Sequence, residues 1–405
     1  MSAALPTVLL ATSADLPDGE PGAAALDAAL VERGIDAAWA RWDDPEVDWA
    51  AADLVAVRST WDYVTRHGAF VGWAQSLDQS RLLNGADVFA WNHDKRYLTD
   101  LGDLPVVPTL LADDRAGLAD GVRHFGTAVV KPRVGAGGAG LLVVTDPDDD
   151  RLGRPVRSHP DYPEVDGPWV VQPLVESIRT NGELSVYVLD GRITQRFDKV
   201  PGEGDVRVNE EFGGRVRAAE TGDVGDLVMQ AYDALAVRFG RPMDYLRVDL
   251  LRWEDAWVVS ELELIEPGLY LDVSPANAGP FADLVAARTR HRSVKTFRHV
   301  GVRAGAAALR SPQPVSVWGR GQAEPGTGAG GFIQCGAGGD SGSARAGGTC
   351  HAHFTAPRRT RRISGGVRAR RTAPAGDPLR DDRLRVRDQP LHDAQQRHPR
   401  GSAGS

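Results

Sequence analysis

Cysteine is nearly absent from this chain of 405 residues, and long apolar runs are missing altogether. The two cysteines, Cys335 and Cys350, both lie after residue 292, so the preceding part holds no disulfide, thiolate metal site or thiol nucleophile. That part also has no H-x-x-x-H pair, which argues against a zinc site, and no G-x-S-x-G motif. These absences exclude thiol chemistry there and disfavour zinc enzymes and serine hydrolases.

The absence of long apolar runs bears on location. No run approaches the roughly 20 residues that cross a bilayer. The N-terminal apolar stretch TVLLAT is too short for a signal peptide and has no basic region before it. We therefore expect a cytoplasmic protein with no membrane association. The hydrophobic fraction of 42% is ordinary for a soluble protein, and the length suffices for two or three domains.

Charge is divided unevenly along the chain. The net charge of −8 combines a net −20 for residues 1–292 with a net +12 for residues 293–405. The second part is rich in Arg, Gly, Ala and Pro and shows no helical or strand period, so we expect a disordered tail or an out-of-frame translation. Nucleic-acid binding by this tail is an alternative, although the acidic remainder would repel a phosphate backbone.

Strand and helix patterns alternate over the first 90 residues. Three short apolar strands are expected, at residues 7–12, 35–40 and 53–59. Helices are expected at about residues 22–33 and 67–80. This alternation predicts an α/β domain with a parallel sheet, whose ligands bind beyond the carboxyl ends of strands. The segment RSTWDY, residues 58–63, follows the third strand and is a candidate site loop. The alternative is a structural loop with a buried tryptophan.

Later patterns predict hairpins and two more helices. Strands should flank a glycine-rich turn within residues 127–144 and form hairpins about Asp190-Gly191 and Glu254-Asp255. A buried strand is expected at residues 167–176 and a loop at 146–163. Helical spacing is found at residues 94–101, 221–238 and 277–290.

A first group of candidate residues can bind phosphate. Arginine outnumbers lysine 43 to 4. Because this chain uses arginine at nearly all basic positions, the lysines at 95 and 131 indicate positions that require lysine itself. The loop containing Gly135, Gly137 and Gly138 can lie flat on phosphates, and the two lysines supply point charges. The loop is neither a Walker A nor a Rossmann motif. The alternative is a flexible hairpin tip with a lysine nearby.

A second group can bind a metal ion. Glu261 and Glu263 share one face of a strand, and the second hairpin brings that face close to Asp249. Three converging carboxylates repel one another unless cations lie between them, and Mg²⁺ is the expected cation. The alternative is a solvated face of the sheet.

A third group is a strand end that can offer backbone groups to an adenine edge. Its residues are Gln172, Pro173, Leu174 and Val175, and Glu183 in the next strand can bind ribose hydroxyls.

The order of these parts, from about residue 90 to 291, resembles the ATP-grasp superfamily. The resemblance implies that Lys95 and Lys131 are the two ATP lysines and that residues 172–175 are the adenine hinge. Arg-Val-Asp at 247–249 is similar to the motif of D-alanine–D-alanine ligases. The sequence Glu261-Leu-Glu263 departs from the usual Glu-x-Asn, which leaves open how two Mg²⁺ ions share the site.

A narrower resemblance concerns the subgroup that includes the cycloserine-forming O-ureidoserine cyclo-ligase, with glutathione synthetase more distant. It is carried by RSTWDY, WNHDKRYL, VPT, GDVRVNEEFGG and ELELIEPGLYL. It implies that Arg207, Asn209 and Arg247 face the transferred phosphate. It also implies substrate contacts from the first domain, by Arg58, Trp61, Asp62 and Tyr63.

The resemblance implies an ATP-grasp fold. The expected parts are a pre-ATP-grasp substrate domain at 1–90, an N-lobe with the glycine loop at 91–170, a C-lobe with the metal site at 171–292, and the tail. The expected partner is an amino-acid-like small molecule, with no nucleic acid or membrane, and a homo-oligomer is left open.

The implied function is an ADP-forming carbon–nitrogen ligase with an acyl-phosphate-type intermediate, either an intramolecular cyclo-ligase or an intermolecular amide ligase of glutathione-synthetase type. A non-catalytic nucleotide-binding regulator is a further alternative.

Overall fold

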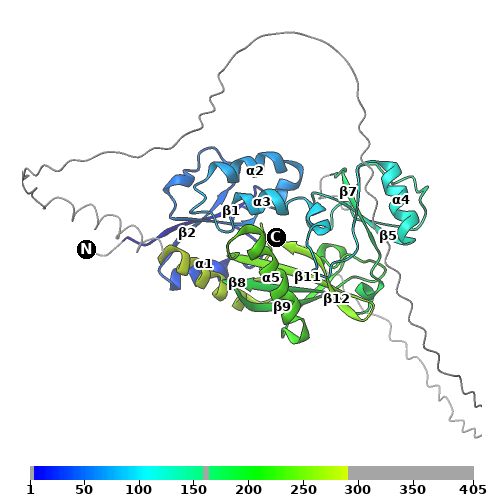
Figure 1. Ribbon diagram of the computed structural model, residues 1–405. Helices are drawn as coiled ribbons and strands as arrows, with labels where there is room; N and C mark the ends of the chain where they lie inside the picture. Colours follow the sequence, from blue (N-terminus) through cyan, green and yellow to red (C-terminus); the bar gives the residue numbers. More distant parts are fainter. Residues whose placement is uncertain (1–3, 158–163, 291–405) are drawn as a thin grey trace, which may run out of the picture. The chain divides into compact units, whose positions relative to one another are not determined.

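The computed structural model describes residues 4–157 and 164–290, all of which belong to one compact unit. Its first sheet is parallel, with strand order β2-β1-β3 (Figure 1). The strands are β1 (Thr7–Thr12), β2 (Asp36–Arg41) and β3 (Leu54–Ser59). This confirms the predicted parallel sheet. The predictions for the tail at 293–405 lie outside the described residues.

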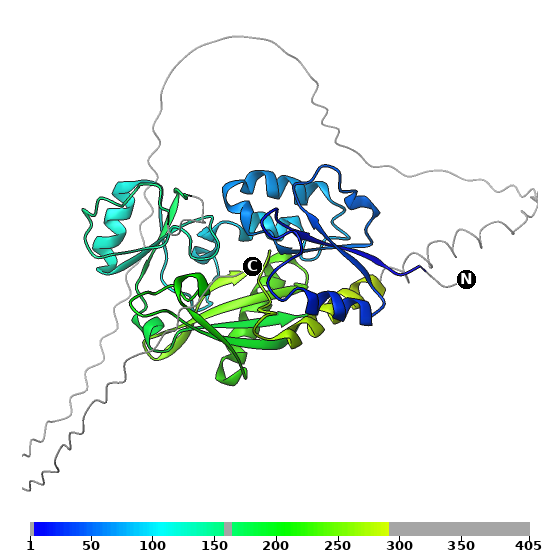
Figure 2. The same ribbon diagram turned by 180° about the vertical axis from the view of Figure 1, so that it is seen from behind.

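Helices cover both faces of the parallel sheet. The helix α1 (Ala24–Glu32) connects β1 to β2, and the helices α2 (His67–Ser76) and α3 (Ala86–Asn92) both follow β3. On one face, Leu26 and Leu30 of α1 pack with Phe281 of the predicted last helix, which occupies residues 278–290 (Figure 2). On the other, Phe70 of α2 and Phe89 of α3 pack against the sheet. Burial on both faces explains why the strands are continuous apolar runs.

The second sheet is antiparallel, with order β4-β7-β5-β6. Its strands are β4 (Leu110–Ala112), β5 (Ala128–Pro132), β6 (Leu142–Val144) and β7 (Trp169–Pro173), and α4 (Arg115–Phe125) packs against it. The predicted strand–turn–strand is β5 and β6. The expected lobe boundary after residue 170 falls inside β7.

Helix α4 and strand β4 were not predicted. The helix has local signals at both ends: the Asp114 side chain accepts a hydrogen bond from the Gly117 N–H, and Gly126 ends it with a φ of 77°. Strand β4 has only three residues, two of them exposed leucines, so it shows no clear period.

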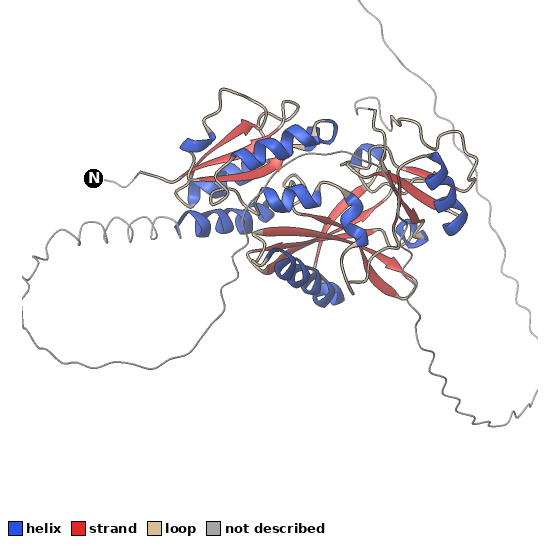
Figure 3. Cartoon of the chain, turned by 45° about the horizontal axis from the view of Figure 1, so that its top comes forward, coloured by secondary structure: helices blue, strands red, loops and turns tan. Residues whose placement is uncertain are grey.

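The third sheet is antiparallel, with order β10-β9-β8-β11-β12, and α5 (Gly225–Phe239) packs against it (Figure 3). Its strands are β8 (Glu183–Leu189), β9 (Arg192–Val200), β10 (Arg215–Ala219), β11 (Tyr245–Trp253) and β12 (Ala256–Glu263). Both predicted hairpins are present. Asp190 and Gly191 join β8 to β9 with φ values of 49° and 73°, as a tight hairpin turn of this type requires.

Short 3₁₀ helices connect these elements. They are η1 (Trp49–Ala51), η2 (Trp61–Thr65), η3 (Lys95–Thr99), η4 (Glu176–Arg179), η5 (Glu210–Phe212), η6 (Gly222–Val224) and η7 (Pro275–Asn277). The helical spacing predicted at 94–101 corresponds to η3. Within the described ranges, no helix has the length and apolar character needed to span a membrane.

Candidate active site

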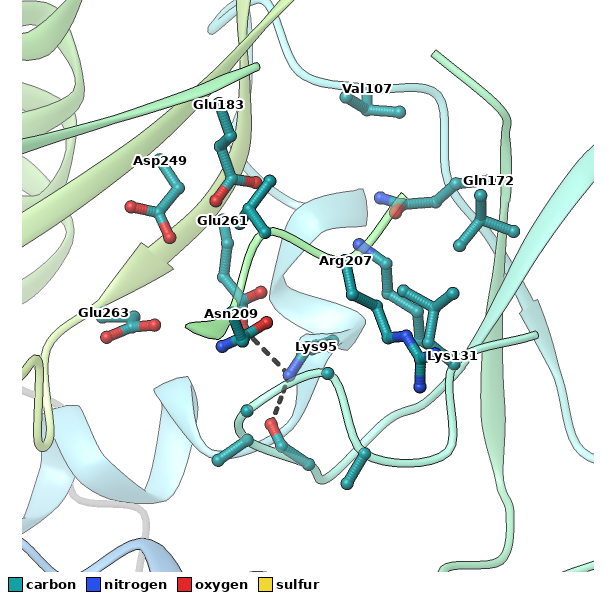
Figure 4. A pocket seen from close by; sticks show the side chains of 18 of the residues that line it. Lys95, Val107, Lys131, Gln172, Glu183, Arg207, Asn209, Asp249, Glu261 and Glu263 are labelled. Carbon is teal, nitrogen blue, oxygen red and sulfur yellow. Dashed lines mark hydrogen bonds and ion pairs between the residues drawn. The ribbon is translucent and has the colours of Figure 1, made fainter. Parts of the chain in front are cut away.

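Residues from all three sheets and their loops line one cavity (Figure 4). It brings together every residue expected to bind nucleotide, metal or the transferred phosphate: Lys95, Lys131, Gly135, Gly137, Gly138, Gln172, Pro173, Leu174, Val175, Glu183, Arg207, Asn209, Arg247, Asp249, Glu261 and Glu263. The structure places all these residues around one cavity, and the role of each is taken up under the proposed function.

One wall of the cavity is acidic, and the strand register creates it. Asp249 of β11 lies directly opposite Glu261 of β12, and Arg247 lies opposite Glu263. Arg247 donates two hydrogen bonds to Asp249, at 2.9 and 2.7 Å, and also pairs with Glu263. Ser185 donates to Asp249 at 2.6 Å.

The charges on this wall differ between its carboxyl groups. Burial by itself would raise the pKa of Asp249, but the Arg247 and Lys199 charges outweigh it and hold that pKa well below its usual range. Burial raises the pKa of Glu263 to about 7, and the Asp249 and Glu261 charges add to this despite Arg247. The wall therefore holds more negative charge than its own cations neutralise.

This wall suits a divalent cation that also binds phosphate. Among the described residues, no group of three or more His, Cys, Asp or Glu side chains is arranged to hold a metal ion by itself. Mg²⁺ usually takes only one or two protein carboxylates and completes its shell with phosphate oxygens and water. Asp249, Glu261 and Glu263 on the cavity face fit that requirement.

Two lysines lie on the facing side. The Lys95 ammonium donates to the Gly135 carbonyl at 2.6 Å and pairs with Glu261 at 2.9 Å. Burial lowers the pKa of Lys131. Over residues 4–157 and 164–290, Lys131 makes no ion pair or side-chain hydrogen bond, so its ammonium group is left to a ligand in the cavity.

The glycine-rich loop joins β5 to β6 and cannot carry side chains at two of its positions. Gly137 and Gly138 have φ values of 61° and 69°, which other residues rarely adopt. A Cβ atom on Gly138 would lie 3.2 Å from the Asn209 side-chain oxygen. The loop is therefore shaped for close approach of its backbone to other groups.

The opposite end of the cavity is apolar. Val107, Val175 and Leu251 belong to a buried cluster there, with Leu174 packed against it. Gln172, at the end of β7, donates to the Thr109 hydroxyl at 2.9 Å. A narrow apolar slot next to a strand end has the form that a planar aromatic ring requires.

Lys199 of β9 also lines the cavity and was not assigned from the sequence. It pairs with Glu183, its cross-strand neighbour, at 2.5 Å and with Asp249 at 3.5 Å. Burial by itself lowers its pKa, but the Asp249 and Glu183 charges outweigh this and raise it. Lysine scarcity was the signal that could have identified it.

Of the four residues of the segment RSTWDY that were expected to contact substrate, only Tyr63 lines the cavity. Arg58 is fully buried, pairs with Glu20 at 2.8 Å and donates to the Pro267 carbonyl at 2.7 Å. Trp61 donates to the Glu266 carbonyl at 3.1 Å.

Asp62 also lies away from the cavity. Its carboxylate accepts a hydrogen bond from the Trp42 indole at 2.9 Å and pairs with Arg66. Arg58, Trp61 and Asp62 therefore do not line the cavity, and each makes at least one of the hydrogen bonds that hold the loop in place.

Known families match two consecutive parts of the chain. The family model of the N-terminal domain of D-cycloserine synthetase DcsG matches residues 8–84, and that of the ATP-grasp domain of prokaryotic glutathione synthetase matches residues 94–231. The cycloserine biosynthesis protein DcsG of Streptomyces lavendulae is 30% identical over 274 residues, which cover 64% of this chain and 90% of that protein.

Solved structures agree with this relationship. The crystal structure of D-cycloserine synthetase DcsG matches with a TM-score of 0.59 and 26% identity, over 70% of this chain and 99% of that one. D-alanine–D-alanine ligase from Bacillus anthracis shares the fold, with a TM-score of 0.51 and 13% identity over 72% of this chain and 99% of its own. The chain therefore belongs to the ATP-grasp family that includes DcsG, and it is an ADP-forming ligase.

Proposed function

We propose that this ligase phosphorylates the carboxyl group of an amino-acid-like small molecule and that a nitrogen of the same molecule then displaces phosphate. The observation that supports this is the cavity itself. Lys95, the acidic wall and Lys131, which has no ion pair within the described ranges, surround a space that ends in an apolar slot. The similarity to DcsG extends through the first 84 residues, which supports a cyclo-ligase of O-ureidoserine type.

The nucleotide is bound along the length of the cavity. Its base lies in the apolar slot beside residues 172–175, and Glu183 accepts hydrogen bonds from the ribose hydroxyls. The glycine loop lies over the phosphates, with Lys95 and Lys131 supplying positive charge. Glu183 is held in place for this role by its ion pair with Lys199, its cross-strand neighbour.

Asp249, Glu261 and Glu263 would hold two Mg²⁺ ions, whose charge offsets that of the phosphate oxygens when they are bound. Arg247, Arg207 and Asn209 face the transferred phosphoryl group. Arg207 is held at the cavity edge by Asp205, whose Oδ2 accepts from Nη2 at 2.6 Å, and by stacking on Phe212. Such fixed charges stabilise a transition state because they need no rearrangement during the reaction.

The reaction then proceeds in two displacements. A carboxylate oxygen of the substrate attacks the γ-phosphorus, the bond to the bridging oxygen breaks, and ADP leaves. The attacking nitrogen next adds to the carbonyl carbon of the acyl phosphate and loses its proton, and phosphate leaves. No side chain forms a covalent bond. The glycine loop excludes water, which would otherwise hydrolyse the acyl phosphate.

A substrate screen tests this function. Purified protein with Mg-ATP is supplied with O-ureidoserine and a panel of amino acids, and nucleotides are separated by chromatography. We expect ADP and phosphate with one amino acid alone, without an added amine. AMP and pyrophosphate as products, or no release of ADP with any member of the panel, would contradict the proposal.

The second candidate is an intermolecular amide ligase. It is favoured by the match of residues 94–231 to the ATP-grasp domain of glutathione synthetase. The same screen separates the two reactions, because an intermolecular ligase needs a second amine substrate before ADP accumulates catalytically.

A further inference from the structure

Glu266 is a cavity carboxylate with no cationic partner. It lies just after β12, lines the cavity and is only 9% exposed. The other cavity carboxylates pair with lysine or arginine: Asp249 with Arg247 and Lys199, Glu261 with Lys95, Glu263 with Arg247, and Glu183 with Lys199. In the described part of the chain, Glu266 makes no ion pair.

A buried carboxylate without a cation is unfavourable in the empty protein. Burial raises the pKa of Glu266 to about 8, and the nearby Glu263 charge adds to this. Tyr63 also lines the cavity close to Glu266, and burial raises the pKa of Tyr63 well above its usual value, so its hydroxyl keeps its proton and can donate a hydrogen bond. No lysine or arginine of the described residues pairs with this carboxyl group, so its ionised form is disfavoured until a cation enters the cavity.

The backbone around Glu266 is held by the first domain. Trp61 donates to the Glu266 carbonyl at 3.1 Å, and Arg58 donates to that of Pro267 at 2.7 Å. The Glu20 carboxylate accepts from the Leu269 N–H at 2.5 Å. These buried contacts explain the position of the Tyr63–Glu266 pair and make it rigid, and a rigid site loses little entropy on binding.

The covalent structure of an α-amino acid limits where its ammonium group can lie in the cavity. A carboxyl group that receives the phosphoryl group must lie near Lys95, Lys131 and the acidic wall. One carbon atom separates it from the ammonium group, which therefore lies close to a cavity carboxylate. Asp249, Glu261 and Glu263 are assigned to metal and to their own cations, and Glu183 to the ribose, so Glu266 is the carboxylate that is left.

We propose that Glu266 and Tyr63 form a subsite that binds the ammonium group of the substrate whose carboxyl is phosphorylated. This inference rests on the proposed function. The ammonium group neutralises the buried carboxylate, and a carboxylic acid without the amino group leaves it unpaired. The subsite therefore selects amino acids over simple carboxylic acids, since unpaired buried groups penalise the wrong substrate.

The test compares two substrates in three variants. The probes are O-ureidoserine, or the amino acid that releases ADP fastest in the screen, and the same acid with hydrogen in place of the amino group. The variants are Glu266→Gln, which keeps size and shape, Tyr63→Phe, and Glu32→Gln on the exposed surface of α1 as the matched control. ADP release gives kcat and KM for each probe, and calorimetry gives the Kd of ATP.

We expect Glu266→Gln to raise the KM of the amino acid roughly 10- to 100-fold, the effect of losing a charged hydrogen bond, and to remove most of the preference over the desamino acid. Tyr63→Phe should act in the same direction but less, and Glu32→Gln should behave as wild type. The Kd of ATP should not change in any variant.

Two results overturn the subsite while leaving the proposed function intact. One is a Glu266→Gln enzyme that keeps the wild-type KM and preference. The other is a loss of ATP binding in that variant, which would place Glu266 with the metal site. If Glu266→Gln does not fold, as thermal unfolding shows, an unchanged preference in Tyr63→Phe overturns the proposal. A wild-type enzyme that releases no ADP with any amino acid overturns both the function and the subsite.

Discussion

Lysine side chains in the cavity have three different environments, and these separate their roles. Lys199 is held between two carboxylates, and Lys95 bridges the glycine loop to Glu261. Lys131 has no such partner among the described residues, and burial lowers its pKa. A buried cation without a counterion is unfavourable, so Lys131 gains most when a phosphate enters the cavity.

Replacing Lys131 by alanine should reduce kcat for ADP release roughly 100- to 1000-fold, as the loss of a fixed charge at a developing negative charge does. Stability should change little or increase, because the removed cation has no partner. Steady-state kinetics and thermal unfolding measure the two effects. Lys131→Arg, which keeps the charge, should retain more activity. An alanine variant with wild-type kcat would remove Lys131 from the proposed site.

Arg58 is expected to act on stability. Replacing it by methionine leaves Glu20 buried without its partner, which should cost about 3–5 kcal/mol in the free energy of unfolding. Urea unfolding measures this. Arg66→Met, which removes the two ion pairs of an exposed arginine with Asp43 and Asp62, is the matched control and should cost about 1 kcal/mol or less. Unchanged stability with a higher KM for the substrate would return Arg58 to direct substrate binding.

At the scale of elements, hairpins place the chemistry. The chain reverses direction at Glu254, which has a positive φ, and β12 then runs antiparallel to β11. Residues on the same face of the two strands therefore lie opposite each other, and this register forms the acidic wall. The hairpin of β8 and β9 sets Lys199 opposite Glu183 in the same way. Elements without a strong period, such as β4 and the 3₁₀ helices, depend on the packing around them.

The glycine loop gives a prediction at this scale. Gly138→Ala adds a Cβ atom 3.2 Å from the Asn209 oxygen and forces a φ of 69° on alanine, at a strain of about 1–2 kcal/mol. The KM of ATP should rise several-fold because the loop moves away from its position. Gly68→Ala in α2 is the control, because the added Cβ atom would have no atom outside its own helix backbone within 4 Å. Equal KM values for the two variants would show that the loop does not cover the nucleotide.

At the scale of the molecule, side chains of residues 84–97 bind the backbone of β11, β12 and the residue after β12. Asn84 donates to the carbonyls of Tyr245 at 2.8 Å and Leu264 at 2.9 Å. Asn92 donates to that of Leu262 at 2.8 Å, and the Tyr97 hydroxyl accepts from the Leu262 N–H at 2.8 Å. These buried bonds fix the segment that carries Lys95 against the strand that carries Glu261.

Truncation after residue 292 tests how much of the chain the enzyme needs. All the residues assigned to the cavity precede this position, as does the helix that packs against α1. We expect the shortened protein to keep the kcat and thermal unfolding temperature of the full chain. A shortened protein that does not fold or turn over, while the full chain does both, would show that the following residues belong to the working structure.

The sequence by itself indicated the hairpins, the parallel first sheet and most of the residues that meet in the cavity, some of them only through the resemblance to the ATP-grasp superfamily. These depend on local signals, namely alternation along strands, turn residues and scarce lysines, and each acts over a short stretch of chain. Only the tertiary structure decided that Arg58, Trp61 and Asp62 face away from the cavity while Lys199 and Glu266 line it. The direction of those side chains depends on contacts between segments far apart in the chain, such as Arg58 with Glu20 and Pro267, which no local pattern encodes.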